Sequence, residues 1–156
     1  MKNKLLFIVA LVLTTVLYAS FNLTHSFVIG SMSGSDSYDE TLAKFPGAVF
    51  REVDRNTMND GVRPLFDYRT VTAKDAKISG AKGKLILQFY NDRLMAIVFY
   101  PHNFSRVEDD LVADMGGKHR TGNLRYTATI DSSCRCVIWR DKFLESRMRK
   151  WIRNFS

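Results

Sequence analysis

The sequence predicts an α+β fold: an N-terminal transmembrane helix, then one small domain with a mainly antiparallel sheet packed against about three helices. Two observations predict it. A long apolar run lies near the N-terminus, and the chain after it switches between helical and alternating apolar patterns. No strand–helix–strand series is long enough for a parallel sheet, which favours an antiparallel one. With 156 residues, 46% of them hydrophobic, the chain suffices for one domain and a targeting segment.

The apolar run covers residues 5–23 and follows Lys2 and Lys4. As a helix it would be about 28 Å long, close to the thickness of the hydrocarbon core of a bilayer. The lysines before it place the N-terminus in the cytoplasm. We therefore expect a single-pass anchor in the cell inner membrane, with the domain on the periplasmic or extracytoplasmic side. Representative positions of this anchor are Leu5, Phe7, Leu11, Leu17 and Leu23.

The alternative is a signal peptide that is removed near residue 20. Leu17 and Tyr18, which would stand three residues before the possible cuts, are bulky for positions that cleavage sites fill with small residues. Retention is favoured, and cleavage stays open. The expected organisation is an anchor over 1–25, a flexible Ser- and Gly-rich linker over 26–36 and a folded domain over 37–156.

The first elements of the domain follow from local patterns. Ser37 and Glu40 fit a capping box, which predicts a short helix that Pro46 and Gly47 end. The period then becomes alternating, which predicts strands over 48–53 and 65–71 joined by a polar loop.

The clearest pattern is a β-hairpin over residues 85–100, where two apolar runs flank Asn91 and Asp92. These two side chains tolerate the left-handed backbone that a tight turn needs. The segment before it, residues 74–84, is polar, cationic and contains glycine, and it is expected to be a solvated loop.

The C-terminal part predicts two helices around a pair of strands. Ser105 and Glu108 repeat the capping-box pattern for a helix that ends near Gly116. Alternation over 124–130, with 134–139 able to pair with it, predicts two strands. Asp141 is the expected N-cap of the last helix.

Cys134 and Cys136 are the only cysteines of the chain. On a regular strand their α-carbons would be roughly 6.5 Å apart, near the upper limit for a disulfide, so a bond needs a turn or bulge. Free thiols, an internal disulfide, pairing with a partner chain and a metal or redox role stay open.

No motif indicates a catalytic or cofactor site, so none of either is expected. Besides the thiols, the soft or imidazole ligands are His25, His102 and His119, and a solvated histidine is the favoured interpretation of His119. We therefore expect no metal. An enzyme or redox factor using Cys134, Cys136 and His119 stays as an alternative.

The net charge of +7 is concentrated after residue 115. This part of the chain has ten cations and three carboxylates, and such an excess favours an anionic partner such as lipid headgroups or an acidic protein. Nucleic acid is not an expected partner because of the expected topology. The cations are Lys118, Arg120, Arg125, Arg135, Arg140, Lys142, Arg147, Arg149, Lys150 and Arg153.

The last helix is amphipathic, and two roles fit it. Its apolar side could pack on the sheet, which is the commoner meaning of such a pattern, and its cationic side could contact a partner or a membrane surface. The predicted contact residues are Arg147, Arg149, Lys150, Trp151 and Arg153.

These observations favour a non-enzymatic accessory or assembly subunit, which docks its outer domain on a larger membrane or envelope complex. Its expected partners are the lipid bilayer and other membrane or envelope proteins. The alternative is a secreted or periplasmic ligand-binding domain released by signal cleavage.

Overall fold

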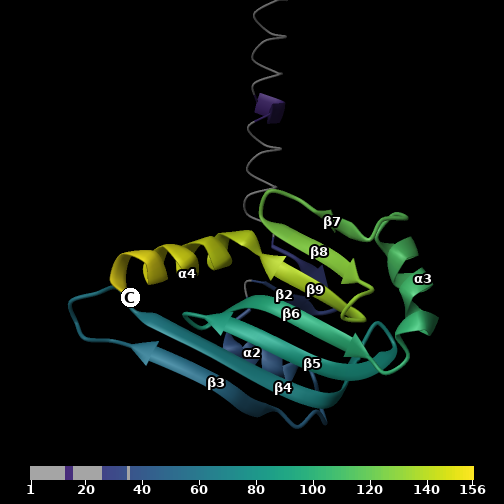
Figure 1. Cartoon of the computed structure of the whole chain (residues 1–156), viewed down its shortest axis with the longest axis horizontal. Coiled ribbons are helices and arrows are strands. Elements are labelled where there is room, and N and C mark those ends of the chain that lie inside the picture. Colours follow the sequence, from purple (N-terminus) through teal and green to yellow (C-terminus); the bar gives the residue numbers. More distant parts are fainter. Residues whose placement is uncertain (1–12, 16–25, 35) are drawn as a thin grey trace, which may run out of the picture.

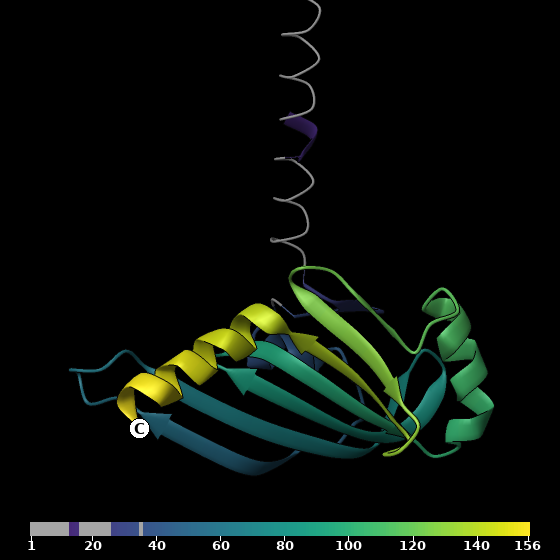
Figure 2. The same ribbon diagram turned by 45° about the horizontal axis from the view of Figure 1, so that its top comes forward.

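In a computed structural model, residues 13–15, 26–34 and 36–156 are described, and residues 26–34 and 36–156 form an α+β domain around one seven-stranded antiparallel sheet (Figures 1 and 2). The seven strands lie in the order β3-β4-β5-β6-β9-β8-β7. Their bounds are β3 Arg51–Met58, β4 Phe66–Ile78, β5 Ala81–Tyr90, β6 Arg93–Pro101, β7 Arg120–Gly122, β8 Tyr126–Asp131 and β9 Cys136–Asp141. The helices are α2 Tyr38–Ala43, α3 Phe104–Asp114 and α4 Lys142–Phe155. The predicted antiparallel α+β class is confirmed.

The transmembrane part of the prediction does not gain the same support. No helix among the described residues is long and apolar enough to cross a membrane. The predicted anchor over 1–25 lies outside the described residues except for 13–15.

Both faces of the sheet carry apolar cores, and different elements cover them. The larger core lies under α2 and α3, and it includes the fully buried Leu87, Ile97 and Val137. The smaller core lies under α4, around Phe66 and Trp151. Figure 2 shows α4 lying along the face of the sheet opposite to α2. The last helix therefore has a packed inner side and an exposed outer side.

The linker predicted for 26–36 contains a small hairpin. Strands β1 Val28–Ile29 and β2 Met32–Ser33 pair with each other, and they place Phe27, Ile29 and Met32 in the larger core. Phe27 is fully buried. The serines and glycines suggested flexibility, but the three large apolar side chains between them decide the structure by packing against the sheet.

The solvated loop predicted for 74–84 is also a hairpin. β4 continues to Ile78, and the chain turns at Ser79 and Gly80, which both have positive φ. A register shift between Ala73 and Ala76 lets the exposed Lys74 and Asp75 interrupt the alternation while the strand continues. Because of this β-bulge, the apolar and polar residues of the strand do not alternate regularly, and the strand was not predicted.

The other predicted elements are found with shifted limits. Ser37 and Glu40 form the predicted capping box of α2, and the hairpin at Asn91 and Asp92 joins β5 to β6. α3 begins two residues earlier than expected, because Asn103 rather than Ser105 accepts the capping hydrogen bond.

Candidate functional site

The inner side of α4 is structural. Trp151 is 5% exposed, its ring centroid lies 4.5 Å from that of Phe66, and its indole N–H donates to the carbonyl of Pro64 at 2.7 Å. Leu144 is buried in the same core. Trp151, which was predicted as a contact residue, therefore lies inside the domain and presents no surface to a partner.

Arg149, Lys150 and Arg153 lie on the outer side of α4, whereas Arg147 lies at its edge, because it is three and four residues from the buried Leu144 and Trp151. All four predicted contact residues other than Trp151 are exposed: Arg147, Arg149, Lys150 and Arg153. We call this set the basic face. Arg149 donates to Glu145 at 2.7 Å, one helical turn away. In the part of the chain that the structure describes, no other ion pair involves the basic face. The fold thus leaves most of its positive charge available to an anionic partner.

All residues that line a shallow, open depression of about 420 Å³ beside the basic face belong to α4, so this depression is part of the surface of one helix. The lining residues are Lys142, Glu145, Ser146, Arg149, Lys150, Arg153 and Asn154. Two large apolar side chains, Ile152 and Phe155, are also substantially exposed near the end of α4. Arginine and aromatic side chains, which are both exposed here, are enriched in protein–protein interfaces.

A buried carboxylate fixes the start of α4. Asp141 is fully buried; one of its oxygens accepts from the backbone N–H groups of Phe143 and Leu144, which confirms it as the N-cap. The other oxygen accepts from Arg125 Nε at 2.8 Å and from Ser26 Oγ at 2.7 Å. We call this arrangement the Asp141 junction. It ties the chain that arrives from the N-terminal apolar run to the helix that carries the basic face.

Tight packing reinforces the Asp141 junction. Gly34 donates its backbone N–H to the carbonyl of Phe27 at 3.0 Å, and a Cβ at this position would lie 2.0 Å from Ser26 Oγ. Ser26 can therefore reach Asp141 only because residue 34 lacks a side chain.

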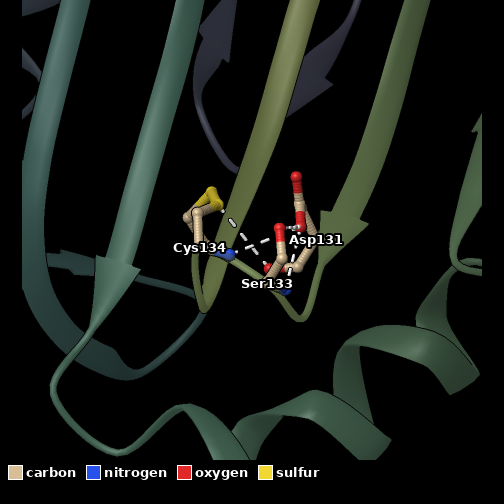
Figure 3. Close-up of a disulfide and its surroundings, with 4 residues drawn as sticks. Asp131, Ser133 and Cys134 are labelled. Atoms are coloured by element: carbon tan, nitrogen blue, oxygen red, sulfur yellow. Dashed lines mark hydrogen bonds between the residues drawn. A yellow bond between two sulfur atoms is a disulfide. The ribbon is translucent and has the colours of Figure 1, made fainter.

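Cys134 and Cys136 form an internal disulfide at the turn between β8 and β9, with α-carbons 5.3 Å apart (Figure 3). This result selects one of the four states left open by the sequence. The required turn is supplied by Arg135, whose φ is 54°. Cys136 is buried and Cys134 is exposed.

Asp131 organises the turn before the disulfide. Its carboxylate accepts from Ser133 Oγ at 2.5 Å and from the backbone N–H of Ser133 at 2.9 Å (Figure 3). These hydrogen bonds lower the pKa of Asp131 below its ordinary value. The acid therefore has a structural role in this turn.

His119 lies against α3. Its Nε2 is 3.7 Å from Glu108 Oε1, an oxygen that also accepts from Ser132 Oγ at 2.7 Å. The glutamate thus joins α3 to the β8–β9 turn. Among the described residues, no group of histidine, cysteine and acidic side chains could hold a metal ion.

A second candidate site is a groove between α3 and the β4–β5 turn, with a volume of about 440 Å³. The buried ring of Phe99 belongs to its lining, as do Val107 and Leu111 of α3, while Lys82 and Arg106 are exposed cations beside them. Apolar walls with a few polar groups are typical of small-molecule sites.

Sequence reasoning located the basic face but missed this groove and the Asp141 junction. Five of the 13 residues that line the groove, 78–82, belong to the segment expected to be a loop. The junction joins Ser26, Arg125 and Asp141, whose distance in the sequence gave no signal of contact. Comparison with protein-family models, with curated proteins and with solved structures gives no significant match.

Proposed function

We propose that this chain is a non-enzymatic, membrane-anchored accessory subunit that docks on an acidic surface of a larger membrane or envelope protein. One observation carries the proposal: the basic face of α4 is exposed, and the packing of the helix depends on its opposite side. Charged groups that the fold does not use are available for recognition, where complementary charge sets partner choice and association rate.

The apolar run over 5–23 supports the anchor in this proposal. The Asp141 junction supports the placement of α4 close to the membrane. Ser26, three residues after that run, is hydrogen-bonded to the N-cap of α4. A chain anchored by this run would hold α4 at a set place close to the membrane, which favours a membrane-embedded partner.

Pull-down of the full chain from gently solubilised membranes tests the docking step. The variant with Arg147→Glu, Arg149→Glu and Arg153→Glu is expected to lose the partner, and wild-type recovery is expected to fall as salt rises. The matched control is Arg51→Glu, Lys74→Glu and Lys77→Glu, which makes the same charge change at exposed positions elsewhere. Equal recovery of both triple variants contradicts the proposed surface, and recovery of the wild type only as a free monomer contradicts docking.

The groove supports a second candidate function, a periplasmic domain that binds a small amphipathic anion after signal cleavage. Its apolar lining would hold the body of such a ligand, and Lys82 and Arg106 its charge. Intact mass of the mature chain distinguishes the two functions, since this one requires a start near residue 20. Loss of a copurifying ligand in Val107→Trp, seen by native mass spectrometry, is the expected result.

A further inference from the structure

A second cationic hollow lies beside the Asp141 junction, between β7, β8 and the start of α4. Its volume is about 390 Å³. The lining residues are Lys118, Arg120, Thr121, Gly122, Asn123, Tyr126, Thr127 and Lys142. None of these is a carboxylate, although three are cations and two are threonines. We call this feature the phosphate hollow.

Two exposed apolar side chains flank the phosphate hollow. Leu124 is 60% exposed and Phe143 is 48% exposed. The segments that carry them are neighbours, because the backbone N–H of Lys142 donates to the carbonyl of Arg125 at 2.8 Å, and the Arg125 guanidinium lies 5.1 Å from the ring of Phe143. The Lys142 ammonium also donates to the carbonyl of Asn123, which holds the β7–β8 loop against α4.

The position of this surface is set by the chain that enters the domain. Ser26, three residues after the apolar run in the sequence, is hydrogen-bonded to Asp141, the residue before Lys142, so residue 26 lies next to the hollow. In Figure 1 the β7–β8 loop is at the top of the domain, whereas the β3–β4 loop is at its far left. Exposed leucine and phenylalanine beside cations are the composition of a surface that enters the lipid headgroup region.

We infer that the phosphate hollow binds the headgroup phosphate of an anionic lipid, while Leu124 and Phe143 enter the interface around it. This inference rests on the proposed anchor, which brings the hollow to the bilayer. It differs from the docking proposal in both surface and partner, because the basic face of α4 takes no part in it. The contact would fix the orientation of the domain and direct the basic face along the membrane toward a partner protein.

The test uses the full chain in lipid nanodiscs. Leu124→Cys is labelled with an environment-sensitive fluorophore while the native disulfide stays oxidised, and Val62→Cys, 90% exposed in the β3–β4 loop, is the control position. Discs contain phosphatidylcholine alone or mixed with phosphatidylglycerol. The label at residue 124 is expected to move into an apolar environment only with phosphatidylglycerol, and the label at residue 62 is expected to stay in water.

Charge removal assigns the contact to the hollow. A cation near an anionic membrane contributes about fivefold to binding, so Lys118→Ala with Arg120→Ala is expected to weaken docking of residue 124 about 25-fold. Arg149→Ala with Arg153→Ala is expected to leave it unchanged. The reverse result, or a signal that does not depend on phosphatidylglycerol, overturns the inference.

Two further measurements distinguish a failure of the proposed anchor from a failure of the proposed lipid site. Recovery of the chain outside the nanodiscs would show that the anchor fails, whereas recovery in the discs with a constant signal at residue 124 would show that the hollow fails. Inorganic phosphate is added to discs of phosphatidylcholine alone. If phosphate alone reproduces the signal, the hollow is a site for free phosphate and the lipid inference is wrong.

Discussion

The inner side of α4 packs on the sheet, and its outer side is exposed to solvent. The inner side buries Trp151 against Phe66 and gives its indole hydrogen a carbonyl acceptor. The outer side carries Arg153 and its edge carries Arg147; both are exposed, and the described residues offer them no ion pair. The same 14-residue helix thus contains residues whose presence is explained by packing on the sheet and residues whose presence is not.

This difference separates residues that build the domain from residues available for recognition. Burying apolar area stabilises a fold in proportion to the area, while exposed ion pairs contribute about 0–1 kcal/mol. Substitutions on the inner side should therefore change stability, and substitutions on the outer side should change association. Unfolding and association measurements on variants of the two sides test that division.

Trp151→Ala should destabilise the domain by about 3–5 kcal/mol, because it removes the largest side chain of the smaller core and leaves a cavity. Urea unfolding of the full chain, followed by circular dichroism, measures the effect. Trp151→Phe should recover much of the loss, since it keeps an aromatic ring and lacks only the hydrogen bond to Pro64. A loss of under about 1 kcal/mol for Trp151→Ala would show that α4 does not depend on this core.

Asp141→Ala should cost about 2–4 kcal/mol, because it removes a helix cap and leaves Arg125 without its buried carboxylate. The guanidinium is partly exposed, with 21% of its side chain accessible, so water recovers part of that loss. The same unfolding experiment measures it.

Gly34→Ala checks that the junction reaches the N-terminal segment. The added Cβ would collide with Ser26 Oγ and push Ser26 away from Asp141. We expect a smaller loss of stability than for Asp141→Ala, together with faster proteolysis near residue 26. Wild-type proteolysis would show that Ser26 is not held by the junction.

Elements of this fold could be predicted from the sequence where the interacting residues are close to one another along the chain. The caps at Ser37 and Asp141 and the hairpin at Asn91 use contacts within a few positions, and all three were predicted and are confirmed. The β1–β2 hairpin was missed because its stability comes from packing on distant strands. Its own composition, rich in serine and glycine, indicated a linker.

The candidate site divides in the same way. Helical periodicity placed Trp151 on the apolar side of α4 and the cations on the rest of the helix. The surface-contact interpretation then put Trp151 among the contact residues, because one helix alone does not show whether its apolar side is covered. The phosphate hollow combines β7, β8 and α4, and only the excess of cations after residue 115 indicated that such a surface could exist.

Cys134→Ser with Cys136→Ser should cost about 1–2 kcal/mol, because a disulfide that closes so short a loop restricts the unfolded chain only slightly. Thermal unfolding of oxidised wild type and of the variant measures the difference. This disulfide is at the β8–β9 turn and not on α4, so partner recovery in the pull-down should stay at the wild-type level. Loss of all function in a folded variant would instead support the redox role that the sequence left open.

Arg147→Ala with Arg153→Ala should have the smallest effect on stability, within about 0.5 kcal/mol per residue, because both side chains are exposed. Arg149 is left in place, since its pair with Glu145 could contribute to the helix. The same variant should reduce partner recovery in the pull-down. If unfolding shows a loss above about 2 kcal/mol with unchanged recovery, these cations belong to the fold, and the division between the two sides of α4 is wrong.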